Sequence, residues 1–171
     1  MRVTIAAAGP SLLTSWPPPG DLGTVIAVNL ALVHLRSCDY FSAGDWDTIQ
    51  RLVPGTVVHQ GYCTTADVAR LIGLGAVVPC FALAVGHRVL TWESLPLGFA
   101  PRWSGVAAFG LAAALGATEV VVAGCDMAGT DDCAAVRDCD RTHRWVEERS
   151  LVAAAEAVLR ARGATITYWG G

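Results

Sequence analysis

The stretch SGVAAFGLAAALGATEVVVAGCD, from Ser104 to Asp126, decides the fold class. Ser104 is a good helix N-cap, and the Ala-rich run Gly105 to Leu115 predicts a helix that Gly116 ends. The run Val120 to Ala123 is continuously apolar, as expected of a strand buried at the centre of a parallel sheet. A helix followed at once by such a strand favours an α/β fold.

Short apolar runs alternate with amphipathic ones elsewhere in the chain. We therefore expect a single Rossmann-like α/β domain over residues 1–171, with a mostly parallel sheet flanked by helices. The expected strands are Val3–Ala8, Thr24–Asn29, Tyr40–Ala43, Thr56–His59 and Thr165–Tyr168. The other expected helices are Ala66–Leu74 and His143–Arg162, the second closed by Gly163, and Ala76–Phe81 fits a strand of ambiguous register. The Pro-rich segment Ser15–Gly23 is expected to cover the sheet, and Cys125–Thr142 to form a polar loop.

The composition excludes several classes of protein. Of the 171 residues, 53% are hydrophobic and 16% charged, with a net charge of −3, so the chain is too apolar to be disordered. All twelve basic residues are Arg, and the absence of Lys excludes both a P-loop lysine and a Schiff-base lysine. The slight acidity argues against a nucleic-acid partner.

The cysteines and apolar runs indicate a protein of the reducing cytoplasm. The longest apolar stretch, Val106–Cys125, is divided by Gly116 and polar neighbours, so no membrane segment is expected. The apolar N-terminus is too short for a signal peptide. Four of the six cysteines lie in apolar surroundings and are expected to be free thiols, namely Cys38, Cys63, Cys80 and Cys125.

Candidate ligand-binding residues follow the first three strands, where ligands of open α/β sheets bind. Gly9, Pro10 and Ser11 directly follow the first strand, where a glycine lets the backbone approach a ligand and Ser11 offers a hydroxyl. The alternative is a tight strand-to-helix turn. Asn29 can hydrogen-bond a base edge or a sugar hydroxyl. Asp45 is either a site carboxylate or a helix N-cap.

A second group of candidates surrounds the C-terminal helices. The helix start at Ser104 and Gly105 suits a phosphate or carboxylate, although simple capping explains it equally. Asp126 lies just past a central strand, where an active-site carboxylate often sits, so it is a candidate catalytic residue. His143 is a candidate general acid or base, and Arg141 and Arg144 are candidates for holding an anionic substrate. The alternative for this segment is a solvated helix start.

A metal site is not expected. Three cysteines and one histidine offer a set of zinc ligands, but their spacing matches no common zinc pattern. That set is Cys125, Cys133, Cys139 and His143.

Several motifs recur in order and together resemble a known group of proteins. They are Gly9-Pro10-Ser11-Leu12, Val28-Asn29, Ser104-Gly105-Val106, the run Ala114 to Val120, and Gly124-Cys125-Asp126. The chain resembles the bacterial sialyltransferases that use CMP-activated sialic acid, and the related domain of archaeal 6-hydroxymethylpterin diphosphokinases. Short stand-alone versions of this domain resemble proteins carried by phages and mobile elements.

The resemblance implies a nucleotide bound at the strand ends. Gly9, Pro10 and Ser11 would lie near the nucleotide phosphate, Asn29 near base or ribose, and Ser104-Gly105 near phosphate or donor carboxylate. We therefore expect a transferase that moves a glycosyl group from a CMP- or UDP-sugar without a metal, with His143 as base. The alternatives are an ATP-dependent diphosphokinase, for which Asp45 and Asp126 would bind Mg²⁺, and a non-catalytic nucleotide-binding or homo-oligomeric interaction module. The acceptor is not identified by the sequence.

Overall fold

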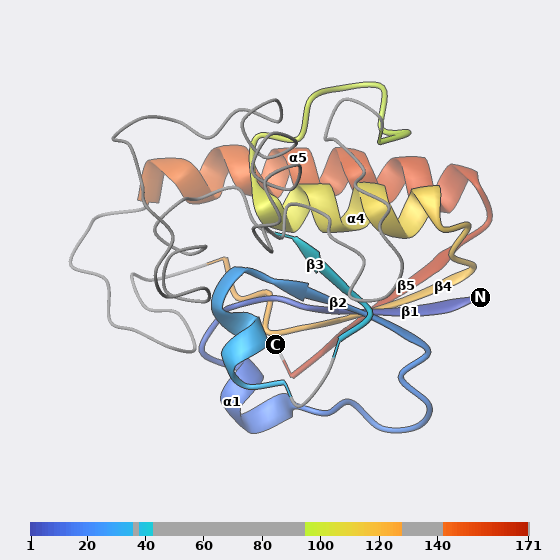
Figure 1. The fold of residues 1–171 in the computed structure, drawn as a ribbon. Helices are drawn as coiled ribbons and strands as arrows, with labels where there is room; N and C mark the ends of the chain where they lie inside the picture. The colour runs from blue at the N-terminus through green and yellow to red at the C-terminus, as the bar shows by residue number, and fades with distance from the viewer. Residues whose placement is uncertain (36–37, 43–94, 128–141, 171) are drawn as a thin grey trace, which may run out of the picture.

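The computed structural model describes residues 1–35, 38–42, 95–127 and 142–170, which form a five-stranded sheet with helices on both faces (Figure 1). The strand order is β3-β2-β1-β4-β5, and every adjacent pair is parallel. The strands are β1 (Arg2–Ala6), β2 (Thr24–Val28), β3 (Tyr40–Ser42), β4 (Glu119–Ala123) and β5 (Thr165–Trp169). The expected Rossmann-like α/β class is thereby confirmed.

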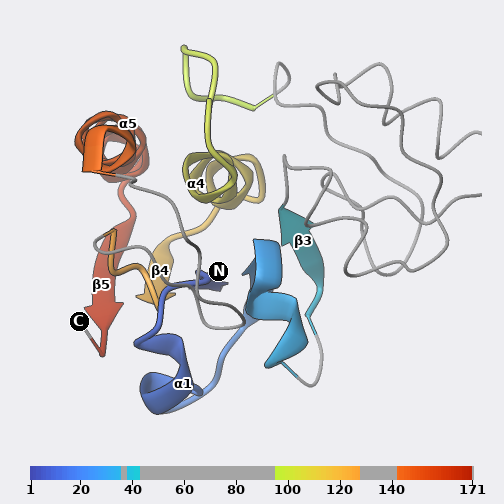
Figure 2. The same cartoon turned by 90° about the vertical axis from the view of Figure 1, so that its left-hand side faces the viewer.

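The helices lie in two layers. Figure 2 shows α4 (Ser104–Ala114) and α5 (Thr142–Ala161) on one face of the sheet and the short α1 (Leu12–Ser15) on the other. A 3₁₀ turn, η1 (Asn29–Val33), follows β2 directly. Because α4 and α5 each lead back into a parallel strand, both begin at the carboxyl edge of the sheet, at the left of Figure 1.

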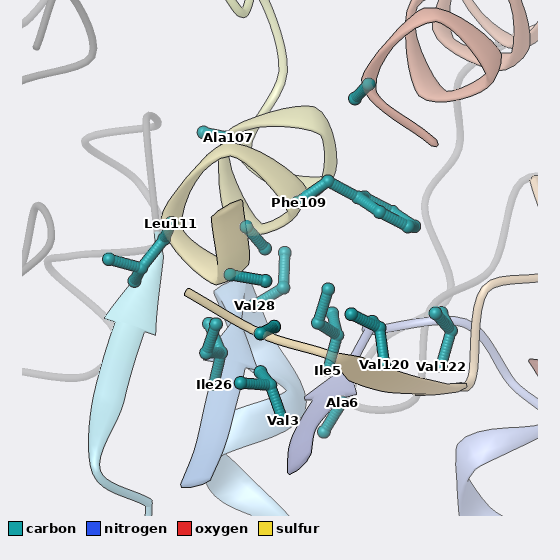
Figure 3. Close-up of a cluster of buried hydrophobic side chains, with 14 of the residues drawn as sticks. Val3, Ile5, Ala6, Ile26, Val28, Ala107, Phe109, Leu111, Val120 and Val122 are labelled. Atoms are coloured by element: carbon teal, nitrogen blue, oxygen red, sulfur yellow. The ribbon is translucent and has the colours of Figure 1, made fainter. Parts of the chain in front are cut away.

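The core lies between the sheet and α4. Alternate residues of the three central strands face this helix, among them Ile5, Ile26 and Val122, and pack with Phe109 and Leu111 (Figure 3). The helix is apolar nearly all round and is buried along most of its length, as expected of a helix with no polar face.

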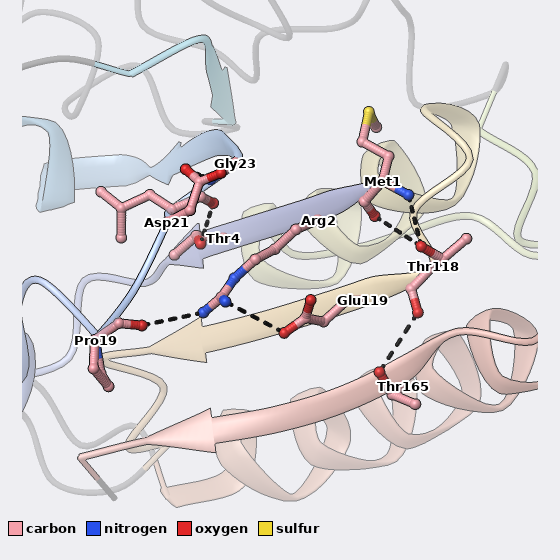
Figure 4. A network of polar contacts seen from close by, with 10 residues as sticks. Met1, Arg2, Thr4, Pro19, Asp21, Gly23, Thr118, Glu119 and Thr165 are labelled. Carbon is pink, nitrogen blue, oxygen red and sulfur yellow. Dashed lines mark hydrogen bonds and ion pairs between the residues drawn. The ribbon is translucent and has the colours of Figure 1, made fainter.

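The opposite face of the sheet carries the segment before β2. The Thr4 hydroxyl donates to the carbonyl of Leu22 at 2.6 Å, and Arg2 bridges the Pro19 carbonyl and the carboxylate of Glu119 (Figure 4). The Pro-rich segment therefore covers part of the sheet, as predicted.

The expected element boundaries differ from the observed ones by one or two residues. β1 ends before Ala7, and β2 ends at Val28 because Asn29 has φ +50°, outside the extended region. The prediction that Ser104 is the N-cap is wrong by one position. Trp103 is the N-cap, and Ser104 lies in the first turn, where its carbonyl accepts the Ser42 hydroxyl at 2.8 Å.

Other predicted segments fall outside the described residues. These are Thr56–His59, Ala66–Leu74, Ala76–Phe81 and most of the polar loop before α5. Within the described part of the chain, Cys38 and Cys125 are free thiols, and no helix is long and apolar enough to cross a membrane.

Candidate functional site

The turn after β1 is joined to the loop after β4. The Gly9 amide donates to the Gly124 carbonyl at 2.7 Å, and the Ser11 amide donates to Oδ2 of Asp126 at 2.9 Å. A Cβ on Gly9 would overlap both the Asp126 carboxylate and that carbonyl. The missing side chain of Gly9 therefore allows the turn after β1 to contact the loop after β4 closely.

This arrangement limits what the turn can offer a ligand. The Leu12 amide donates to the Gly9 carbonyl, and Pro10, which is exposed, has no amide hydrogen. The backbone N–H groups of Gly9 and Ser11 are already used, so the polar group of this turn that remains without a partner among the described residues is the buried Ser11 hydroxyl. Asp126 links the two loops, since its carboxylate accepts the N–H of the residue preceding α1.

Three buried polar atoms lie without hydrogen-bond partners along the carboxyl edge. They are Oγ of Ser11, Oδ1 of Asn29 and Nε1 of Trp103; the fourth such atom among the described residues, Nε of Arg2, lies at the start of β1. They belong to the loops after β1 and β2 and to the start of α4. A buried polar group with no partner costs about 1–3 kcal/mol, so each of these atoms needs a physical explanation.

Backbone strain occurs at the same edge. Among the described non-glycine residues, Asn29 (φ +50°) and Met127 (φ +44°) have positive φ, and they directly follow β2 and closely follow β4. A left-handed backbone at a residue other than glycine is uncommon and often marks a ligand site. In the pairing of β1 with β2, Ala6 lies beside Ala27. Asn29, two residues further on, therefore lies next to the start of the turn that follows β1.

The start of α4 is occupied by a carboxylate from α5. Glu148 is 7% exposed, and a Cβ built on Gly105 would lie 3.2 Å from its Oε1. Its Oε2 accepts from Nε of Arg144 at 3.1 Å. A negative charge is favoured at a helix N-terminus, so an anionic ligand at Ser104 and Gly105 would share that position with Glu148.

Arg144 is held in place by aromatic rings as well as by Glu148. Its guanidinium carbon lies 4.3 Å from the ring centre of Trp103 and 5.5 Å from that of Trp145. Such stacking orients the planar guanidinium and leaves its remaining N–H groups to find acceptors. The predicted substrate-binding arginine is thus a fixed, half-buried group beside the unpartnered indole N–H of Trp103.

His143 lies on the first turn of α5 and is exposed. No described contact joins it to the turn after β1 or to the start of α4. Arg149 connects α5 to the loop after β4, donating to the Met127 carbonyl at 2.8 Å. Asp45 and Arg141 lie outside the described residues, as do Cys133 and Cys139 of the zinc alternative.

Cys125 lies under α5 next to acidic groups. Burial, and then the charges of Glu148, Asp126 and Glu156, raise the pKa of its thiol to about 12. A thiol of this kind stays protonated at neutral pH, so it is a poor nucleophile and a poor metal ligand. Among the described residues, no three or more His, Cys, Asp or Glu side chains gather as a metal site.

The residue that the sequence prediction missed is Glu148. Its spacing of four residues from Arg144 places the two side chains on one helix face, and this spacing was the available signal. That the pair is buried against α4 depends on how the two helices pack.

No family model matches the chain, and no curated protein and no solved structure gives a significant match.

Proposed function

We propose that the chain is a nucleotide-dependent transferase that moves a glycosyl group from a CMP- or UDP-sugar bound at the carboxyl edge of the sheet. One observation carries the proposal: of the four buried side-chain polar atoms without a partner among the described residues, three, from Ser11, Asn29 and Trp103, lie along this edge. In open α/β sheets this edge is where ligands bind. A ligand that supplies their missing partners offsets the cost of leaving them unpaired.

The three atoms differ in the partners that they require. Oδ1 of Asn29 accepts a hydrogen bond, which a base amino group or a ribose hydroxyl donates. The Ser11 hydroxyl both donates and accepts, and the Trp103 indole only donates. A nucleoside phosphate carries all the matching groups: amino and hydroxyl donors at one end and phosphate oxygens at the other.

The phosphate in this proposal is bound by side chains rather than by a glycine-rich turn. The amides of Gly9 and Ser11 are engaged within the chain, whereas the Trp103 N–H and the guanidinium of Arg144 lie beside each other at the start of α4. Arginine suits phosphate oxygens because its N–H groups form a rigid planar fork. Arg144 would also neutralise charge that develops on the departing nucleotide.

The chemical step needs a base for the acceptor hydroxyl. We assign this role to His143, whose exposed imidazole lies on the first turn of α5 at the same edge. In the transfer, the acceptor oxygen forms a bond to the sugar carbon while the bond from that carbon to the nucleotide phosphate breaks. His143 takes the hydroxyl proton. Asp126 keeps the two loops in place, and Asp45 and Arg141 are kept as further candidates.

A thermal-shift experiment tests the proposal. The full chain is unfolded in the presence of CMP, CDP, UDP, GDP or ATP, each with and without Mg²⁺, because a ligand that prefers the folded state raises Tm. Stabilisation by CMP or UDP without metal supports glycosyl transfer. If only ATP together with Mg²⁺ stabilises the protein, glycosyl transfer is overturned in favour of diphosphoryl transfer. If no nucleotide raises Tm, both functions are overturned.

The base is tested separately once a nucleotide has been identified. The variant His143→Ala should lose hydrolysis of the corresponding nucleotide-sugar while keeping the same thermal shift with the nucleotide. Undiminished hydrolysis would remove His143 from the mechanism.

A further inference from the structure

The strand β5 forms one edge of the sheet, and its outer side has no partner strand among the described residues. It pairs with β4 on its inner side and is last in the strand order (Figure 2). An open edge presents a row of backbone N–H and C=O groups that can pair with another strand.

The ladder with β4 identifies which backbone groups face outward. The Thr165 amide, at the start of β5, donates to the Thr118 carbonyl at 3.0 Å. Backbone groups of successive residues in a strand point alternately to the two sides, so those of Thr165 and Thr167 point to β4. The N–H and C=O groups of Ile166 and Tyr168 therefore point to the open edge.

The sequence of β5 has none of the features that usually protect an edge. The strand TITYW contains no charged residue, no proline and no glycine, and all five residues favour strands. Tyr168 and Trp169 are each 42% exposed. Their polar atoms are already paired, the Tyr168 hydroxyl with Glu156 and the Trp169 indole N–H with the Ser15 carbonyl. What remains exposed on these side chains is mostly apolar ring surface.

The neighbouring helix α5 presents a matching surface. The centre of its exposed face is uncharged and consists of small or apolar residues, with Val146 69% exposed. These residues are Val146, Ser150, Ala153 and Ala157. The flank nearer β5 carries Arg149, Glu156 and Arg160, so it holds charges of both signs. A surface that holds both signs can pair with a copy of itself.

We propose that β5 pairs antiparallel with β5 of a second copy of this chain, around a twofold axis at Thr167, to form one continuous ten-stranded sheet. In this register Ile166 of each copy lies opposite Tyr168 of the other. The outward groups of both residues then form four backbone hydrogen bonds. The uncharged strand does not repel its copy, and the α5 helices lie on the same side of the joined sheet. This proposal is independent of the proposed enzymatic function.

The test uses Thr167, which is exposed and would lie directly opposite itself across the axis. Molar mass is measured by sedimentation of the full chain over a range of concentrations, and the wild type is expected at about twice 17.9 kDa. Thr167→Lys and Thr167→Glu should each raise the dimer dissociation constant about fivefold, because like charges face each other across the strands. An equimolar mixture of the two variants should restore or exceed wild-type association.

Thr165→Lys is the matched control. It adds the same charge to the same face of the strand but lies opposite Trp169 of the second copy, so dimerisation should be kept. Ile166→Pro removes an outward N–H that β4 does not use and should give a folded monomer. Circular dichroism checks folding of each variant. A monomeric wild type, or a dimer that Thr167→Lys and Thr165→Lys weaken equally or not at all, overturns the proposal.

Discussion

Replacing Asn29 by glycine should raise the stability of the fold while weakening its binding of nucleotide. Asn29 has φ +50° and a buried Oδ1 without a partner, and both features cost free energy in the ligand-free protein. Relief of a left-handed backbone contributes about 1 kcal/mol, and removal of the unpaired carbonyl about 1–3 kcal/mol. The extra chain entropy of glycine in the unfolded state offsets about 0.5–1 kcal/mol of this.

We therefore expect Asn29→Gly to be more stable than the wild type by about 1–3.5 kcal/mol without ligand. For a chain of this length that corresponds to a rise in Tm of about 2–14 °C. If the proposed function holds, the same variant would lose one hydrogen bond to the nucleotide, worth about 0.5–1.5 kcal/mol, so its Kd should rise about two- to tenfold.

Thermal unfolding gives the first quantity and titration calorimetry with the best-binding nucleotide gives the second. Asn29→Ala is the control, since it also removes the amide but keeps a Cβ at positive φ, and it should be less stable than the glycine variant by up to about 0.5 kcal/mol. A glycine variant that is less stable than the wild type and binds nucleotide equally well would refute the reasoning.

Three further predictions concern the loops and α5. Gly9→Ala should destabilise the fold by about 3 kcal/mol in urea unfolding, because its Cβ overlaps neighbouring backbone and carboxylate atoms; a loss under 1 kcal/mol would contradict this packing. Arg144→Ala should lower the free energy of unfolding by about 2 kcal/mol, because it breaks a largely buried pair with Glu148. Arg160→Ala is the control: it breaks a more exposed pair of the same spacing and should cost about 0.5 kcal/mol. Equal losses in the two variants would contradict the importance of burial for the Arg144 pair. The raised pKa of Cys125 favours its neutral form in the folded state, so the stability that it contributes is complete below pH 9 and falls as pH rises towards 12. The difference between wild type and Cys125→Ala should shift in favour of the alanine variant over this range, and a constant difference would contradict the assignment.

The sheet was predictable where the local sequence has only one stable arrangement. Within residues 104–126, Gly116 closely follows the helix α4, and polar residues separate it from the apolar strand β4. Both elements begin and end within one residue of their expected positions. The end of β2 was misplaced by one residue, because nothing in the local pattern shows that Asn29 adopts positive φ.

The candidate site was predictable as a region but not as a set of contacts. Parallel strands bring Ser11 and Asn29 to one edge, and this follows from topology. The engagement of the Ser11 amide by Asp126 depends on a contact between residues 115 positions apart. The position of Glu148 at the start of α4 depends in the same way on helix packing, which periodicity alone does not specify.

The most direct test of the proposed nucleotide site is a ¹H–¹⁵N correlation spectrum of the full chain, titrated with CMP or UDP. The Trp103 indole N–H, assigned by loss of its signal in Trp103→Phe, is a buried donor without a partner among the described residues. The account predicts that this signal and the backbone amide of Asn29 show the largest shifts, which saturate with the same Kd. Saturable shifts confined to other residues, or no shifts at millimolar nucleotide, would contradict it.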